Sequence, residues 1–326
     1  MDFLALQSSR NRLKAAMREW FSHHQYLEID TPLIVTTPGS EVYLNYFATE
    51  WQDYDQSKHR LFLRSSPELH MKQAIAKGAQ RIFQIGACFR NGGELSDWHH
   101  PEFTMLEYYQ TGIDFESFVT LTEDLVRHCF KAFNVENLLP KKIERLTVTD
   151  AFAQFAGINL IDGDPHLAAK AILQGVTSVR PEDSFEDAYF KTLIERIEPA
   201  LANMKAVVLW DYPPSQAALA KVEQGFAKRF EIYIGRIELC NGFHELTDPS
   251  ANQQVFIDIK SKRTNMGLET PPNDPDFEAA LNTGIPPCCG NAVGFDRLLA
   301  LLNDSKSLAD AVPFRNAAPW RKRLTP

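Results

Sequence analysis

The sequence contains no uninterrupted apolar run near the roughly 18 to 20 residues that a membrane-spanning helix needs. Its first residues also lack the basic segment followed by an apolar segment that marks a secretory signal. We therefore expect a cytoplasmic protein that does not enter a membrane.

Positive charge is also scarce, with 34 lysine and arginine residues against 42 aspartate and glutamate residues. The resulting formal net charge is −8. Binding to a nucleic-acid backbone without regard to sequence usually depends on a surplus of positive charge, although local basic patches remain compatible with these totals. Nucleic acid is therefore not the first partner to expect.

The cysteines do not form a Cys-x-x-Cys pair, which argues against a common type of zinc or redox site. The neighbours Cys288 and Cys289 are poorly arranged to share a metal ion or to form a disulfide. We expect all five cysteines to be reduced and packed inside the fold: Cys88, Cys129, Cys240, Cys288 and Cys289.

The chain has 326 residues and 44% hydrophobic content, enough to bury one large core or two smaller ones. Apolar spacing and turn residues predict helices over 9–24, 67–77, 115–133, 249–266 and after Arg297. They predict extended segments over 26–29, 33–35, 61–64, 81–89, 102–109, 206–212 and 230–241. The irregular order of these elements predicts a single α+β domain over 1–326 around a mostly antiparallel sheet, with a mainly helical insertion at about 140–205.

The strand predicted over 102–109 carries an unusual mixture of side chains on one face. Because successive side chains of a strand alternate, Phe103, Glu107 and Tyr109 lie on the same side. A half-exposed strand with a solvated Glu107 is the simplest interpretation. Nearby Arg90 favours another, because a guanidinium binds phosphate oxygens in a bidentate way and Phe103 offers a purine a stacking surface.

A second group of polar residues lies in the hairpin predicted near residue 235. A two-residue turn at Ile234 and Gly235 would place Glu231 and Glu238 opposite each other, with β-carbons roughly 5 Å apart. A Mg²⁺ ion that also held nucleotide phosphates would relieve their repulsion. In the alternative interpretation the hairpin is exposed and Arg236 partly balances the two carboxylates.

A third segment, 290–297, is a strand rich in small residues that leads into a helix. Glycines allow a ligand to approach the backbone closely, and Arg297 stands at the entry of the helix. Taken alone, this segment is equally typical of a bulged strand followed by a core helix.

Together and in this order, these segments resemble the signature motifs of class II aminoacyl-tRNA synthetases, and within that class those of lysyl-tRNA synthetase. Residues 26–32 resemble motif 1, the dimer-forming element, residues 89–103 resemble motif 2, and residues 290–297 resemble motif 3. The resemblance covers most of the chain. It implies an α+β catalytic domain, a mostly antiparallel sheet flanked by helices, and a homodimer.

The resemblance also implies residue roles for an enzyme that uses ATP and Mg²⁺ to activate an amino acid. Arg90 and Arg297 would be the catalytic residues, and Glu231 and Glu238 would bind Mg²⁺. The ATP-binding residues would be Arg90, Glu94, His99, Phe103, Glu231 and Arg297. The amino-acid-binding residues would be Glu68, Glu107, Tyr109, Asn241, Glu245 and Ala292. Such a surplus of carboxylates suits a substrate with two ammonium groups.

Two departures point away from a tRNA synthetase. The motifs begin near residue 20, which leaves no room for the N-terminal barrel that lysyl-tRNA synthetases use to read the anticodon, so tRNA is not expected as a partner. Ala292 replaces the glycine that lysyl-tRNA synthetases usually carry. In length and order the chain instead resembles the elongation factor P lysine ligase family, which transfers activated (R)-β-lysine to a lysine of elongation factor P. Residues 214–220 resemble the same family.

Several questions stay open at the level of sequence. The motif 2 loop, Gly92-Gly93-Glu94, is one residue longer than usual, and Asp97 and Trp98 would alter how an acceptor docks. The alternatives are a lysyl-adenylate synthetase that serves another acceptor and a catalytically silent paralogue that regulates a partner. Neither α-lysine nor (R)-β-lysine is excluded, because one methyl group shifts discrimination by only about 1 to 3 kcal/mol.

Overall fold

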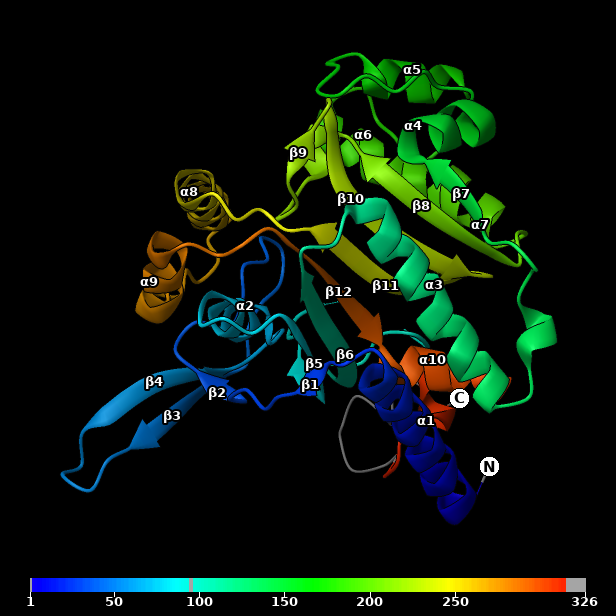
Figure 1. Cartoon of the computed structure of the whole chain (residues 1–326). Helices are drawn as coiled ribbons and strands as arrows, with labels where there is room; N and C mark the ends of the chain where they lie inside the picture. The colour runs from blue at the N-terminus through cyan, green and yellow to red at the C-terminus, as the bar shows by residue number, and fades with distance from the viewer. Residues whose placement is uncertain (1, 94–95, 315–326) are drawn as a thin grey trace. The chain divides into compact units, whose positions relative to one another are not determined.

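The computed structural model describes residues 2–93 and 96–314 (Figure 1). The chain divides into two compact units. Unit 1 comprises Met1–Val135 and Leu246–Pro326, and unit 2 comprises Glu136–Glu245. None of the helices in the described part of the chain combines the length and the apolar character needed to cross a membrane.

The main sheet of unit 1 holds the strands predicted to carry motifs 2 and 3. Its strands, in spatial order, are β1 (Leu27–Glu28), β5 (Arg81–Phe89), β6 (Glu102–Thr111) and β12 (Cys288–Gly294). β1 runs parallel to β5, whereas the β5–β6 and β6–β12 pairs are antiparallel. The predicted α+β fold with a mostly antiparallel sheet is thus confirmed.

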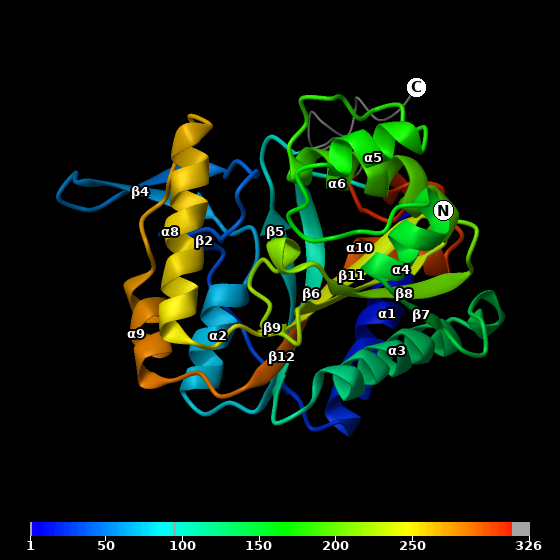
Figure 2. The ribbon, with the colours of Figure 1, turned by 90° about the horizontal axis from the view of Figure 1, so that it is seen from above.

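A second, three-stranded sheet in unit 1 consists of β2 (Ile34–Val35), β4 (Lys58–Leu63) and β3 (Ala48–Gln52). The hairpin of β3 and β4 extends away from the rest of unit 1 (Figures 1 and 2). The sequence did not predict β3, because all five of its residues are exposed and it lacks the apolar alternation of a half-buried strand.

The described part of unit 1 contains six α-helices, and the sequence predicted all of them except the one over Pro275–Thr283. They are α1 (Phe3–His23), α2 (Glu68–Ala76), α3 (Phe115–Ala132), α8 (Pro249–Asn265), α9 (Pro275–Thr283) and α10 (Phe295–Leu302), with a short 3-10 turn η5 (Leu308–Asp310). The carboxylate of Asp248 accepts a hydrogen bond from Ala251 N at 2.8 Å and thereby caps α8. α1 begins six residues before the prediction, where Asp2 caps it. The first four residues of the helix are all apolar and therefore show no spacing of a single apolar face.

Unit 2 is built on strands β7 (Glu144–Thr147), β8 (Ala206–Tyr212), β10 (Phe226–Ile234) and β11 (Ile237–His244), with β9 (Val222–Glu223) paired to β10. Its helical segments are η1 (Glu136–Leu138), α4 (Val148–Ala151), η2 (Phe152–Ala156), α5 (Leu167–Leu173), α6 (Phe185–Thr192), η3 (Leu193–Ile197), α7 (Glu198–Leu201) and η4 (Pro214–Gln216). About half of the stretch over 140–205 is helical, and it also contains β7, which the sequence did not predict. Four residues are too few to show a strand's periodicity.

All five cysteines are buried thiols, as the sequence predicted. Burial raises the pKa of Cys88 and of Cys129 to about 12. These two side chains therefore stay protonated at neutral pH and contribute as small apolar groups to the core.

Candidate active site

Arg90 and Phe103 lie together at the open end of the β5–β6 hairpin. Arg90 follows the last residue of β5, and its backbone N donates to Pro101 O at 2.8 Å. The guanidinium carbon of Arg90 lies 5.3 Å from the centre of the Phe103 ring, so the cation covers one face of the ring. The Arg90 side chain is 42% exposed and remains accessible to an anionic ligand. Glu94, the predicted loop carboxylate, lies outside the described residues.

His99 and Arg297 are also brought together, although 198 residues separate them. Arg297 Nη2 lies 2.8 Å from His99 Nε2, and Ser96 Oγ lies 2.9 Å from His99 Nδ1. Because a guanidinium can only donate, His99 Nε2 accepts the hydrogen bond and its proton resides on Nδ1. His99 is therefore a neutral ring that orients Arg297. A β-carbon at Gly294 would lie 3.1 Å from Arg297 Cδ, so glycine leaves room for this side chain.

A buried ion pair fixes the backbone next to these residues. Asp296 Oδ1 accepts from Arg10 Nη1 at 2.6 Å, and Asp296 Oδ2 accepts from Thr104 N at 2.6 Å. Thr104 follows Phe103, and Asp296 precedes Arg297. One carboxylate therefore ties α1 to the start of β6 and to the start of α10.

Glu107 is buried, with 2% exposure, and both of its carboxylate oxygens are hydrogen-bonded. Tyr109 Oη donates to Glu107 Oε1 at 2.7 Å, and Ser66 Oγ donates to Oε2 at 2.9 Å. The interpretation of Glu107 as a solvated side chain is therefore wrong. Ala292 of β12 lies directly opposite Glu107 of β6 in the antiparallel pairing, so the two residues share a face of the sheet.

Glu68 opens α2 and pairs with a lysine of the same helix. Lys72 Nζ lies 2.6 Å from Glu68 Oε1, and the Lys72 side chain is 1% exposed. The backbone N of Glu68 donates to Ser66 Oγ at 3.0 Å. Ser66 therefore links Glu68 to Glu107, a role that the sequence analysis missed. The sequence did contain a signal for this role, because Ser66 carries a hydroxyl group and stands directly before Pro67 and Glu68 at the start of a predicted helix.

In unit 2 the hairpin of β10 and β11 differs from the prediction. Ile234 pairs with Ile237, so the turn consists of Gly235 and Arg236, with Gly235 at a positive φ of 56°. A bulge on β11 then places Glu238 opposite Tyr233 and Asn241 opposite Glu231. The expected direct opposition of Glu231 and Glu238 is therefore wrong.

The bulge nevertheless keeps both carboxylates on one face of the hairpin. Glu231 and Tyr233 are two residues apart on β10 and therefore lie on the same face. Glu238 of β11 pairs with Tyr233 and shares that face with it. Tyr233 Oη donates to Glu231 Oε2 at 2.9 Å. Burial, followed by the negative charges of Glu231 and Glu238, raises the pKa of Tyr233.

Arg229 holds two of the predicted site residues, although the sequence analysis did not identify it. Its Nη2 donates to Glu231 Oε1 at 2.6 Å, its Nε donates to Asn241 Oδ1 at 3.2 Å, and its Nη1 donates to Gln216 O at 3.1 Å. Burial lowers the pKa of Arg229, but the Glu231 carboxylate, Tyr212 and Tyr189 together outweigh this effect, so the net change is upward. Glu245, the remaining predicted residue of unit 2, is 2% exposed and forms an isolated bridge with Ala220.

The carboxylates of Glu231 and Glu238 fit a Mg²⁺ ion that binds together with nucleotide phosphates. In the described residues there is no group of three or more His, Cys, Asp or Glu side chains arranged to hold a metal ion. Glu231 and Glu238 are a smaller set, and Mg²⁺ is usually held by one or two carboxylates together with substrate phosphates. Each Glu231 oxygen keeps a second lone pair beside the hydrogen bond that it accepts.

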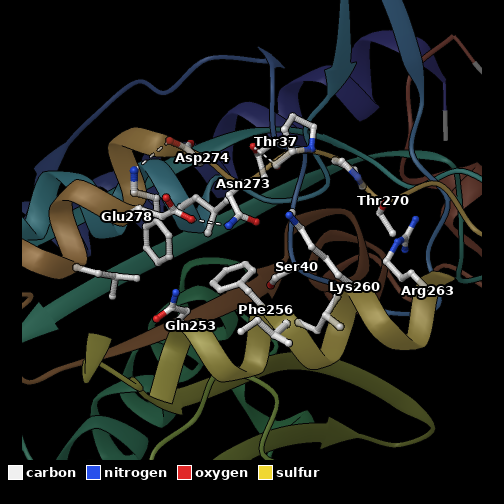
Figure 3. Close-up of a pocket in the computed structure, with 18 of the residues that line it drawn as sticks. Thr37, Ser40, Gln253, Phe256, Lys260, Arg263, Thr270, Asn273, Asp274 and Glu278 are labelled. Atoms are coloured by element: carbon white, nitrogen blue, oxygen red, sulfur yellow. Dashed lines mark hydrogen bonds between the residues drawn. The ribbon is translucent and has the colours of Figure 1, made fainter. Parts of the chain in front are cut away.

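A cavity of about 450 Å³ in unit 1 involves other residues. In Figure 3, Phe256 and Lys260 of α8 face Thr37, Ser40 and Asn273 across it. In Figures 1 and 2, α8 and α9 lie beside α2. Among the described residues, none of those predicted to bind ATP, Mg²⁺ or the amino acid lines this cavity.

Comparison with known proteins places this arrangement in a family. The family model for class II tRNA synthetases (D, K and N) matches residues 4–318. The elongation factor P–(R)-β-lysine ligase of Vibrio parahaemolyticus is 36% identical over 315 residues, which cover 94% of each chain. The chain belongs to the class II tRNA synthetases and, within them, to the elongation factor P–(R)-β-lysine ligase family.

Further members of the ligase family are similar to this chain over nearly its full length. The ligase of Hamiltonella defensa is 33% identical over 304 residues, or 91% of each chain. The ligase of Proteus mirabilis is 32% identical over 326 residues, covering 96% of this chain and 97% of its own. The similarity thus includes both compact units.

Proposed function

We propose that this chain uses ATP to activate a lysine-type amino acid, (R)-β-lysine in first place, and transfers it to a lysine side chain of elongation factor P. The observation that carries the proposal is the match to ligases of this name over more than nine-tenths of the chain. The buried Glu107, which shares a sheet face with Ala292, supports the choice of an amine-bearing substrate.

In the first step, the amino-acid carboxylate attacks the α-phosphorus of ATP and expels pyrophosphate. Arg90 binds the α-phosphate and Phe103 stacks on the adenine. Arg297, oriented by the neutral His99, binds the outer phosphates. Catalysis then consists of positioning and charge neutralisation, and no protein nucleophile is required.

The amino acid is held by acceptors for its two ammonium groups. Glu107 and Glu68 supply carboxylates in unit 1, and Tyr109 fixes Glu107 through its hydroxyl hydrogen bond. By resemblance to the family's motifs, Asn241 and Glu245 are proposed as further acceptors. In the second step, the amine of the acceptor lysine attacks the adenylate carbonyl, the amide bond forms, and AMP leaves with loss of a proton.

Mg²⁺ is proposed to be held by Glu231 and Glu238 and by the phosphates of ATP, where it neutralises negative charge. Removing divalent cations with excess chelator should therefore abolish amino-acid-dependent exchange of pyrophosphate into ATP. Adding back MgCl₂ should restore it. Exchange that continues at its full rate in chelated buffer would contradict a role for the metal.

The cellular setting and assembly are part of the same proposal. Cytoplasmic localisation is proposed because the acceptor belongs to the translation machinery. A homodimer is proposed from the likeness of residues 26–32 to motif 1. A tRNA substrate is not proposed, given the net charge of −8 and the ligase names of the relatives.

Amino-acid-dependent exchange of pyrophosphate into ATP tests the activation step. We expect the highest rate with (R)-β-lysine in a panel that also contains α-lysine, (S)-β-lysine and the other standard amino acids. Binding of ATP without exchange for any amino acid would favour the catalytically silent paralogue instead.

A further inference from the structure

The loop over 38–46 in unit 1 carries a carboxylate to the junction between β4 and α2. Glu41 Oε2 and Oε1 lie 2.8 Å and 3.0 Å from Ser65 Oγ. A β-carbon at Gly39 would overlap with both Ser65 Oγ and Glu41 Oε2. The absence of a side chain at residue 39 therefore allows Glu41 to reach Ser65.

The backbone of this loop is firmly anchored. Arg263, which is 2% exposed, donates through Nη1 to the carbonyl oxygens of Glu41, Val42 and Leu44 at 2.9, 2.9 and 2.7 Å. Tyr46 Oη donates to Glu41 O at 3.2 Å. Hydrogen bonds from Arg263 of α8 and from Tyr46 at the end of the loop thus hold the main chain, while the Glu41 side chain remains 29% exposed.

Glu41 lies close to residues that bind both substrates in the proposed reaction. Its Oε1 is 3.9 Å from Nη2 of Arg90, the proposed ligand of the α-phosphate. Its hydrogen-bond donor, Ser65, directly precedes Ser66, whose hydroxyl donates to Glu107. The 65–66 dipeptide therefore connects Glu41 to the proposed amino-acid pocket.

The charges around these carboxylates differ. Glu68 is matched by Lys72 at 2.6 Å, a hydrogen-bonded ion pair. Glu41 faces Arg90 across 3.9 Å, which is longer than a hydrogen bond. Once Arg90 binds a phosphate, part of its charge is neutralised there, and Glu41 attracts another cation more strongly.

We propose that Glu41 is a specificity-determining residue that accepts a hydrogen bond from one ammonium group of the amino-acid substrate. The inference rests on the proposed activation of a lysine-type amino acid. It adds a carboxylate that the sequence motifs do not identify, and it couples the two substrates, because ATP engages Arg90 and frees Glu41 for the ammonium group.

The test compares the KM values for (R)-β-lysine and for ATP in pyrophosphate exchange by wild-type chain and by Glu41→Gln. Losing a charged hydrogen bond should raise the KM for (R)-β-lysine by roughly 10- to 100-fold. The KM for ATP should change by less than about threefold, because the substitution leaves the Arg90 guanidinium in place.

Two further variants separate the carboxylate's position from its charge. Gly39→Ala keeps Glu41 but forces its carboxylate away from Ser65, so it should raise the same KM. Glu50→Gln is the matched control, because Glu50 is exposed and pairs with Lys58 on the β3–β4 hairpin. It should leave both KM values unchanged.

Each outcome decides a different claim. If the wild-type chain catalyses exchange and the KM for (R)-β-lysine is unchanged in Glu41→Gln, the inference about Glu41 is wrong but the proposed function still stands. A lower KM for ATP without an effect on the amino acid does the same, because Glu41 would then merely oppose phosphate binding at Arg90. If no lysine-type amino acid stimulates pyrophosphate exchange by the wild-type chain, the proposed function is wrong, and the inference about Glu41 is wrong with it.

Discussion

Replacing Arg90 with alanine is expected to lower the rate of adenylate formation by roughly 10²- to 10³-fold, because charge accumulates on the α-phosphate in the transition state. The structure places this guanidinium beside Phe103 with 42% of the side chain exposed, so it is available to an anion without unfolding the loop. The rate is measured by pyrophosphate exchange at saturating ATP and amino acid.

Two companion variants sharpen this prediction. Arg90→Lys should recover only a small part of the lost rate, because an ammonium group cannot bind two phosphate oxygens in a bidentate way or stack equally well on Phe103. Arg60→Ala removes an exposed ion pair with Glu269 and should leave the rate unchanged. A loss of less than about tenfold in Arg90→Ala would contradict a direct role in transition-state stabilisation.

Replacing Arg229 with alanine is expected to reduce the free energy of unfolding by about 3 kcal/mol, because a buried carboxylate loses its ionic partner. Glu231 is 5% exposed and accepts from Arg229 Nη2 at 2.6 Å. The same substitution releases Asn241 from its hydrogen bond with Arg229. The shift is measured by urea denaturation of unliganded chain.

A double-mutant cycle checks the cause of this loss. Adding Glu231→Gln to Arg229→Ala should restore part of the stability, because the neutral amide no longer leaves a buried charge unpaired. Arg236→Ala, at the exposed hairpin turn, serves as the control and should change the unfolding free energy by less than about 0.5 kcal/mol. A double variant less stable than Arg229→Ala would contradict the ion-pair explanation.

Long apolar elements could be predicted from the sequence. The strands expected over 81–89 and 206–212 correspond to β5 and β8, because both are continuous, largely apolar runs without an exposed side chain and with clear ends. β3 and β7 were missed, since one is fully exposed and the other has only four residues. Propensity and periodicity carry little information about such strands.

The predicted site residues came from ordered motifs, and their packing depends on contacts that periodicity does not encode. The register of Glu231 and Glu238 depends on a β11 bulge, which no spacing rule in this segment indicates. The Glu41 side chain is hydrogen-bonded to Ser65, and Arg229 is hydrogen-bonded to Asn241 on the neighbouring strand. Only the folded chain shows which of its many charged side chains these two residues contact.

The most direct test of the central claim is the intact mass of purified elongation factor P after incubation with this chain, ATP, Mg²⁺ and (R)-β-lysine. We predict a mass gain of one β-lysyl group on wild-type elongation factor P, with release of AMP. We predict no gain when the acceptor lysine is replaced by arginine. Unmodified elongation factor P despite strong pyrophosphate exchange would contradict the account and identify a lysyl-adenylate synthetase with another acceptor.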